Sequence, residues 1–219
     1  DSPVRTGTAL WNETFSFQVA YRSNKSMQSV QVQAQSLPIA LPADAVITIR
    51  EVGLVPSELP AYDNPDAGYI RSTPGLYPDL LQPLDGPIRL LSGQWRSIWV
   101  TVTLPSMPKP ESGSLSDPLI CPIQLTFTDT DGQLLGSETF TLEVLPAELP
   151  QQRLVHTEWF HCDCLANQYG VEVFSEAHWQ LIGQYARNAA EHGVNMLLPP
   201  LFTPPLDTAV GGERRTVQL

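Results

Sequence analysis

The chain has 219 residues, of which 42% are hydrophobic and 16% charged, a composition typical of a globular protein with a buried core. Its formal net charge is −11 without any basic run, which excludes the phosphate-binding surface of a DNA- or RNA-binding protein. No apolar stretch approaches the ~20 residues that cross a bilayer, so we expect neither nucleic acid nor membrane as a partner.

The first part of the chain alternates apolar and polar residues with a period of two. Such alternation predicts strands that place one face on a core and the other in water. Asp131 and Gly132 separate the last two of these runs and predict a tight hairpin, because its turn requires a positive φ. The runs predict an all-β sandwich domain at residues 1–150. They lie at about residues 14–22, 30–35, 45–52, 98–104, 123–128 and 139–144.

Residues 56–87 interrupt the alternation with closely spaced prolines, and we expect a long loop there. One interpretation is a proline-stiffened crossover on the surface. The other is that Tyr62, Tyr69 and Tyr77 reach toward a ligand site in the neighbouring domain.

After Pro150 the pattern changes to strand, helix and strand. Residues 153–160 and the almost fully apolar residues 194–198 predict the two strands. Ser175 is the expected N-cap of the helix between them, and Gly193 the residue just past its end. The apolar positions of this helix, which we expect to face a core, are Trp179, Ile182, Ala186, Ala189 and Ala190.

A strand, helix and strand joined in this way predict a βαβ unit of parallel strands. We therefore expect a mixed fold, with the β-sandwich followed by the first βαβ part of a (β/α)8 TIM-like barrel at residues 151–219. These residues supply material for about two strand–helix units, so we expect a truncated barrel.

Barrels of this kind place their functional side chains just past the strand ends. His161 and Asp163 follow the first strand and can bind ligand hydroxyls, or they satisfy one another. Asp207 follows the second strand in a loop that two prolines hold. Arg214 lies further along this loop and either grips an anionic or amide group or is an exposed solvated charge. These four residues are the predicted binding residues.

Cys162 and Cys164 alternate with His161 and Asp163, and all three residue types are zinc ligands. The run lacks the spaced cysteine pairs of structural zinc sites, and small buried hydrophobes are the favoured interpretation of the cysteines. We expect no metal and no cofactor. Trp159 precedes this run in the strand and can face either way.

Four motifs in this part of the chain belong together. They are Glu158 to Ala166, Tyr169 to Ser175, His192 to Leu197 and Thr203 to Thr208. They resemble the start of the catalytic barrel of glycoside hydrolase family 123 and its uncharacterised relatives. Upstream, Tyr77 to Asp79 and Trp99 to Val102 are similar to the β-sandwich that precedes that barrel.

The resemblance implies exo-hydrolysis of β-linked N-acetylgalactosaminides with the substrate's 2-acetamido group as nucleophile. In the family an adjacent Asp-Glu pair orients that group and supplies the general acid/base, an exception to the two-carboxylate scheme. This chain contains no Asp-Glu dipeptide. We therefore assign no catalytic residue, and we expect a carbohydrate-binding fragment of a glycosidase that is inactive by itself.

Two further expectations follow. The alternative function is a non-catalytic carbohydrate- or protein-binding sandwich, for which Trp95 and Trp99 are the candidate exposed aromatics. An incomplete barrel exposes strand edges and apolar faces, which the sandwich or a second copy in a homo-oligomer would cover. No signal peptide is present at Asp1, and the compartment, cytoplasmic or secreted, stays open.

Overall fold

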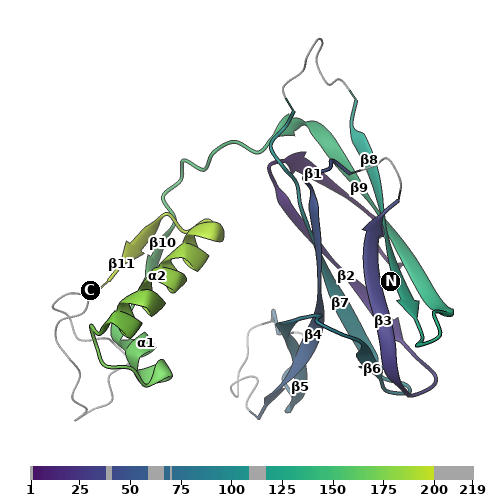
Figure 1. Cartoon of the computed structure of the whole chain (residues 1–219), viewed down its shortest axis with the longest axis horizontal. Helices are drawn as coiled ribbons and strands as arrows, with labels where there is room; N and C mark the ends of the chain where they lie inside the picture. Colours follow the sequence, from purple (N-terminus) through teal and green to yellow (C-terminus); the bar gives the residue numbers. More distant parts are fainter. Residues whose placement is uncertain (1, 38–40, 59–66, 70, 109–116, 200–219) are drawn as a thin grey trace. The chain divides into compact units, whose positions relative to one another are not determined.

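The computed structural model describes residues 2–37, 41–58, 67–69, 71–108 and 117–199 (Figure 1). The chain forms two compact units, Asp1–Leu149 and Pro150–Leu219. The elements of the first unit are β1 (Thr6–Trp11), β2 (Thr14–Arg22), β3 (Met27–Ser36), β4 (Val46–Ser57), β5 (Gly75–Pro83), β6 (Ile88–Leu90), β7 (Trp95–Thr103), β8 (Leu119–Thr128) and β9 (Leu134–Glu148). Those of the second are β10 (Thr157–Trp159), α1 (Cys162–Tyr169), α2 (Glu176–Glu191) and β11 (Met196–Leu198).

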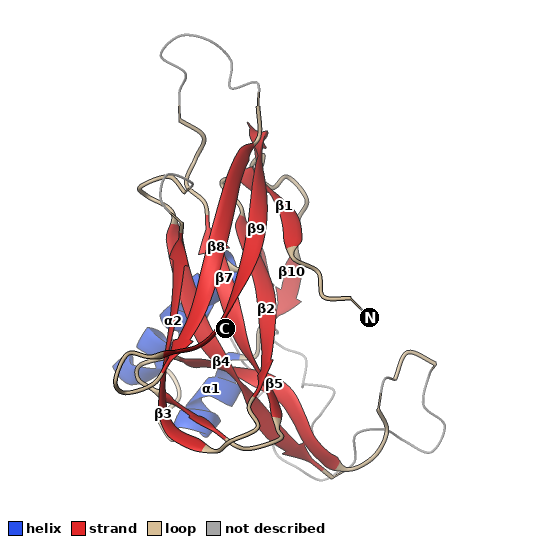
Figure 2. Ribbon diagram, turned by 90° about the vertical axis from the view of Figure 1, so that its right-hand side faces the viewer, coloured by secondary structure: helices blue, strands red, loops and turns tan. Residues whose placement is uncertain are grey.

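The first unit is built from two sheets with the strand orders β1-β9-β8-β3-β6 and β2-β7-β4-β5 (Figures 1 and 2). The recorded strand pairs are antiparallel, except that β1 runs parallel to β9. Side chains of both sheets meet in shared clusters, for example Val102 of β7 with Ile123 of β8 and Leu142 of β9. The unit is therefore a two-layer sandwich around one apolar interior.

The predicted alternation is confirmed where the two sheets face each other. Along β8, Ile123 and Leu125 are buried, whereas Gln124 and Thr126, which alternate with them, are half-buried. Fully burying a side chain of this size contributes about 1.5–3 kcal/mol, so the inward rows of β7, β8 and β9 supply much of the stability. The inward residues of these three strands are Ile98, Val100, Val102, Cys121, Ile123, Leu125, Phe127, Phe140, Leu142 and Val144.

The predicted hairpin joins β8 to β9. Gly132 has a φ of 80°, and the backbone N–H of Asp129 donates to the carbonyl of Gln133 at 3.0 Å. The Asp129 carboxylate accepts hydrogen bonds from the N–H groups of Asp131 (3.0 Å) and Gln133 (2.8 Å). Asp129 thus shapes the turn for which Gly132 supplies the backbone freedom.

The expectation of a loop throughout residues 56–87 was wrong, because Gly75–Pro83 forms β5 against β4. β5 is an edge strand whose residues are mostly exposed, so its sequence needs no apolar alternation and tolerates Pro78. Tyr77 of this strand donates its hydroxyl to the Thr73 carbonyl, so it is engaged locally. Tyr62 lies outside the described residues.

The second unit contains the expected pair of parallel strands, β10 and β11, whose partners are Thr157–Met196, Glu158–Leu197 and Trp159–Leu198. Each strand is shorter than the sequence predicted. The helix signals are confirmed for α2. Ser175 caps its start by accepting from the N–H of His178 at 3.3 Å, and Gly193 follows its end with a φ of 85°.

Two details of this unit differ from the expectation. A second helix, α1, begins at Cys162, where the sequence pattern was compatible with a continuing strand. Trp179 was expected in a core but is 43% exposed, and in α2 it is His178 that is buried. Neither of these described helices is long and apolar enough to cross a membrane.

Candidate functional site

The predicted binding residues begin at the connection between β10 and α1. Because β10 and β11 are parallel, their carboxyl ends lie at the same edge of the two-stranded sheet. The N–H of Phe160, just past β10, donates to the carbonyl of Leu198 at 3.2 Å and extends the pairing by one step. His161 then closes the connection as the N-cap residue of α1. This strand-to-helix edge is where an α/β fold presents functional side chains.

His161 has an extended backbone, with φ −93° and ψ 90°, and its side chain makes no capping hydrogen bond. Its Nδ1 atom is buried and has no hydrogen-bond partner among the residues that the structure describes. The imidazole stacks on Trp159, with ring centroids 6.3 Å apart and planes inclined by 29°. Trp159 is 70% exposed, which settles the direction that the sequence left open. The two rings form an aromatic edge, in which Trp159 is open to solvent and the His161 Nδ1 atom is buried without a partner among the described residues.

Asp163 lies two residues further on, in the first turn of α1, and is 7% exposed. In a continuing strand, His161 and Asp163 would share one face, but the start of α1 removes that relationship. A carboxylate in the first turn is favoured by the positive end of the helix dipole. Asp163 therefore has a role in stabilising α1 in addition to its predicted role in binding.

The Cys162 thiol is buried at the first residue of α1. Burial, followed by the neighbouring Asp163 carboxylate, raises the pKa of the Cys162 thiol above its usual value. Burial alone raises the pKa of Cys121, in the sandwich, to about 11. The nucleophile and metal ligand is the thiolate, so raised pKa values favour the interpretation of these cysteines as small buried hydrophobes. The described residues include no group of three or more His, Cys, Asp or Glu side chains that could hold a metal ion.

His178 was not singled out from the sequence, although it is fully buried. Its Nδ1 accepts a hydrogen bond from the N–H of Phe174 at 2.9 Å, and its Nε2 donates to the carbonyl of Cys162 at 2.7 Å. Both ring nitrogens are thus used by the neutral imidazole. The first bond also supports Phe174, whose φ of 64° is unusual for a residue other than glycine. The sequence signal that could have revealed His178 is its position three residues after the expected N-cap Ser175, in the first turn of the helix.

A second feature that the sequence did not reveal is the pair of His156 and Glu158. Their side chains meet at 3.0 Å, and both are about half exposed. Asn195, just before β11, accepts from the N–H of His156 at 2.8 Å and donates to the carbonyl of Leu154 at 3.0 Å. The pair follows the alternation of β10, so Glu158 points away from the side on which Trp159 lies.

The other predicted binding residues, Asp207 and Arg214, lie outside the described residues. The structure therefore places His161 and Asp163 around the first turn of α1 and does not address the other two.

Comparison with known proteins confirms the family resemblance. Residues 159–219 match the family model described as glycoside hydrolase 123, catalytic domain. The matched segment starts at Trp159, the last residue of β10, and so includes the aromatic edge and α1.

Among solved structures, the chain is similar to a family 123 glycoside hydrolase from Clostridium perfringens, studied for glycolipid glycan hydrolysis. The TM-score is 0.61 at 15% identity over 88% of this chain, a likeness that shows the fold alone. The chain spans 33% of the length of that structure. A mutant of the SrpA adhesin from Streptococcus sanguinis matches at 15% identity over 71% of this chain and 64% of the adhesin, with a TM-score of 0.30. A search of curated proteins finds no match.

Proposed function

We propose that the chain is the amino-terminal part of a glycoside hydrolase of the family 123 type, in which the sandwich precedes a (β/α)8 barrel. The observation that carries the proposal is the family match over residues 159–219, which begins at the strand-to-helix edge with its Trp159–His161 stack. The parallel pairing of β10 with β11 supports their assignment as the first two barrel strands.

The proposed substrate is a β-linked N-acetylgalactosaminide. Hydrolysis would be assisted by the substrate, whose acetamido carbonyl attacks its own anomeric carbon. In an Asp-Glu pair, the aspartate would orient the acetamido group, and the glutamate would protonate the leaving glycosidic oxygen. The chain contains no Asp-Glu dipeptide, so in this proposal the pair lies in barrel sequence beyond these residues. By itself, the 219-residue chain would be inactive.

The role proposed for His161, Asp163, Asp207 and Arg214 is contact with substrate. We assign His161 a hydrogen bond to a sugar hydroxyl, because its buried Nδ1 atom lacks a partner among the described residues and its ring stacks on the exposed Trp159. Trp159 offers the aromatic surface on which a sugar ring can pack. Asp163 and the two residues of the later loop would bind further hydroxyl or amide groups.

The test uses two substrates with the product of the complete reading frame that encodes this chain. We expect hydrolysis of 4-nitrophenyl N-acetyl-β-D-galactosaminide and none of 4-nitrophenyl β-D-galactoside, which lacks the acetamido nucleophile. The 219-residue chain serves as the inactive control. Failure to cleave the N-acetylgalactosaminide, or equal cleavage of both glycosides, would overturn the proposal.

We also propose that the apolar residues of β10 and β11 are covered in solution. In the 219-residue chain by itself, a second copy of the chain would cover them. Trp159 is 70% exposed, Met196 45% and Leu198 42%, and the pairing of β10 with β11 leaves outer edges on both strands. Size-exclusion chromatography with light scattering on the 219-residue chain tests this. A dimer is expected, and a clean monomer would reject the second copy.

A second candidate function, a non-catalytic carbohydrate-binding role for the sandwich, is favoured by one specific feature. It is a cavity at one end of the sandwich, lined by apolar and basic residues.

A further inference from the structure

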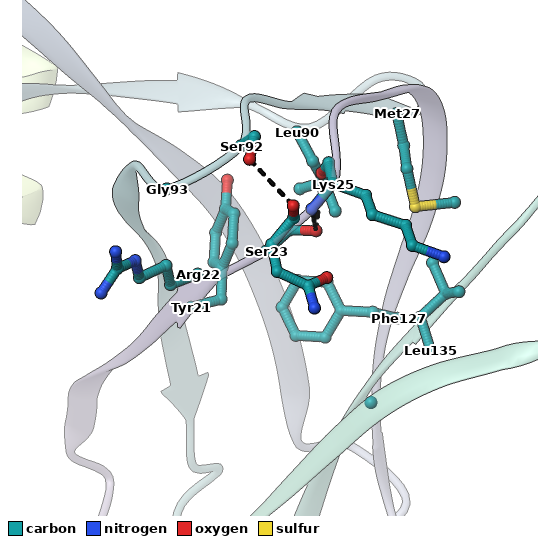
Figure 3. A pocket seen from close by; sticks show the side chains of 12 residues that line it. Tyr21, Arg22, Ser23, Lys25, Met27, Leu90, Ser92, Gly93, Phe127 and Leu135 are labelled. Carbon is teal, nitrogen blue, oxygen red and sulfur yellow. Dashed lines mark hydrogen bonds between the residues drawn. The ribbon is translucent and has the colours of Figure 1, made fainter.

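The sandwich contains a cavity of about 850 Å³ at the end of β2 (Figure 3). Its wall is formed by the end of β2 with the turn at residues 23–26, by residues after β6, and by the ends of β8 and β9 next to their hairpin. Elements of both sheets therefore contribute. The volume lies in the range of small-ligand sites.

The lining combines an apolar floor with a polar rim. Tyr21 and Phe127 lie with ring centroids 5.2 Å apart, and Met27 and Leu90 extend the apolar surface. Asn24 and Lys25 are exposed residues of the turn that add an amide and an ammonium group. A sugar ring has the matching character, because it presents C–H groups on its face and hydroxyl groups at its edge.

The charge of the lining is opposite to that of the chain. Arg22 and Lys25 line the cavity, whereas within the described part of the chain no Asp or Glu does, although the net charge is −11. Figure 3 shows these two side chains extending on opposite sides of Tyr21. In the described structure neither forms an ion pair, and Arg22 lies 6.0 Å from the Trp95 ring.

One carboxylate does contact a lining residue. Glu51 accepts a hydrogen bond from the Tyr21 hydroxyl at 3.5 Å, but its charge is paired with Arg96 at 3.2 Å. The residues that line the cavity therefore carry a net positive charge, which favours an anion.

The turn that carries Lys25 is held by its own hydrogen bonds. The Ser23 hydroxyl donates to the carbonyl of Lys25 at 2.7 Å and accepts from its N–H at 3.1 Å. Across the cavity wall, the Ser92 hydroxyl donates to the carbonyl of Asn24 at 2.9 Å, and the N–H of Gly93 donates to the carbonyl of Ser23 at 2.8 Å. A turn fixed in this way loses little freedom when a ligand binds, which lowers the cost of binding.

We propose that this cavity binds an acidic saccharide, with its carboxylate on Lys25 and its ring on the apolar floor next to Tyr21. The positive charge is a property of the cavity, and the choice of a saccharide rests on the proposed function. This site belongs to the first unit, whereas the aromatic edge at Trp159 belongs to the second.

The test is calorimetric titration of the 219-residue chain with digalacturonate, with lactose as a neutral disaccharide and hexanoate as a carboxylate without a sugar. We expect digalacturonate to bind at least about tenfold more tightly than lactose, since a charge-assisted hydrogen bond is worth that much. Binding should weaken between about 50 and about 500 mM NaCl. Hexanoate should not saturate the site.

Two variants locate the site. Lys25→Gln should weaken digalacturonate binding about tenfold or more. Leu135→Trp, at a lining residue that is 41% exposed, should block the cavity without disturbing the core. Arg187→Gln, an exposed position on α2, is the matched control and should bind normally.

Each other outcome overturns the proposal. If lactose binds as tightly as digalacturonate, the site does not require an anion. If hexanoate does, the site does not recognise a sugar. If digalacturonate does not bind, or if Lys25→Gln leaves its affinity unchanged, the proposed binding site is rejected. Hydrolysis of 4-nitrophenyl glycosides reports on the barrel alone, so the proposed function and this proposal can fail independently.

Discussion

The buried imidazole of His178 donates its Nε2–H to the backbone carbonyl of Cys162 at 2.7 Å and so ties the first turn of α2 to the first turn of α1. The same ring accepts from the N–H of Phe174 at 2.9 Å. One side chain thus makes hydrogen bonds to two backbone groups from different segments of the second unit. Through Cys162 it fixes the segment that carries His161 and Asp163.

Replacement of this histidine should destabilise the second unit. His178→Ala removes both hydrogen bonds and leaves the Phe174 N–H without its acceptor, at an expected cost of about 1–3 kcal/mol. Urea unfolding followed by circular dichroism at the helical band measures it, because α1 and α2 are the described α-helices. His192→Ala, at an exposed position, is the control. Equal midpoints for the two variants would contradict the structural role.

Two isoleucines of β8 test the sandwich core. Ile123 is 1% exposed, whereas Ile120, three residues earlier, is 53% exposed. Ile123→Ala should lower the free energy of unfolding by about 2–5 kcal/mol, because it leaves a cavity between the sheets. Ile120→Ala should cost less than about 1 kcal/mol. Denaturant unfolding of both variants measures the difference, and similar losses would contradict the assigned inward face of β8.

The stability of the sandwich should depend on pH through Tyr21. Burial, then the nearby Glu51 carboxylate, raises the pKa of Tyr21 to about 12 from an ordinary value of 10.0. A phenol whose pKa is raised by folding stabilises the fold fully below pH 10 and loses that contribution as the pH rises toward 12. The free energy of unfolding, measured at pH values between 10 and about 12, should therefore fall as the pH rises.

The control for that titration is Tyr21→Phe, which should remove part of the decline. Tyr77→Phe, on the edge strand β5, should retain it. If the decline is the same in Tyr21→Phe and in the unaltered protein, Tyr21 does not ionise as described.

The proposed substrate contacts make a kinetic prediction for the product of the complete reading frame. Asp207→Ala should raise KM or lower kcat by roughly ten- to a hundredfold, the value of a hydrogen bond to a charged group. Asp44→Ala, at an exposed position in the sandwich, is the control and should leave both constants unchanged. Unchanged kinetics for Asp207→Ala would remove that residue from the site.

The sequence predicted those parts of the fold in which burial imposes a pattern. The runs around Ile98 to Val102 and Ile123 to Phe127 alternate because one face of each strand enters the core. The Asp131-Gly132 turn was predictable because it requires a positive φ. The Ser175 cap was predictable because the first N–H groups of a helix need an acceptor. These signals need no knowledge of distant residues.

The elements that were missed depend on distant partners or bury little. β1 buries Ala9 and Trp11 and pairs in parallel with β9, far along the sequence. β6 has three residues, and β5 lies at an edge. α1 is an eight-residue helix whose start is bound to His178, sixteen residues away, which no local pattern reveals.

The candidate site was predictable in its place but not in its geometry. The position of His161 just past a strand followed from the strand-helix-strand pattern. Its stack on Trp159 and the burial of Asp163 depend on where α1 begins, and the sequence pattern does not specify that.

The most direct test of the central claim is proton NMR of the first product released from 4-nitrophenyl N-acetyl-β-D-galactosaminide by the product of the complete reading frame. Attack by the acetamido group and then by water inverts the anomeric carbon twice, so the account predicts that the β-anomer of N-acetylgalactosamine appears first. Initial release of the α-anomer, or the absence of any product, would contradict it.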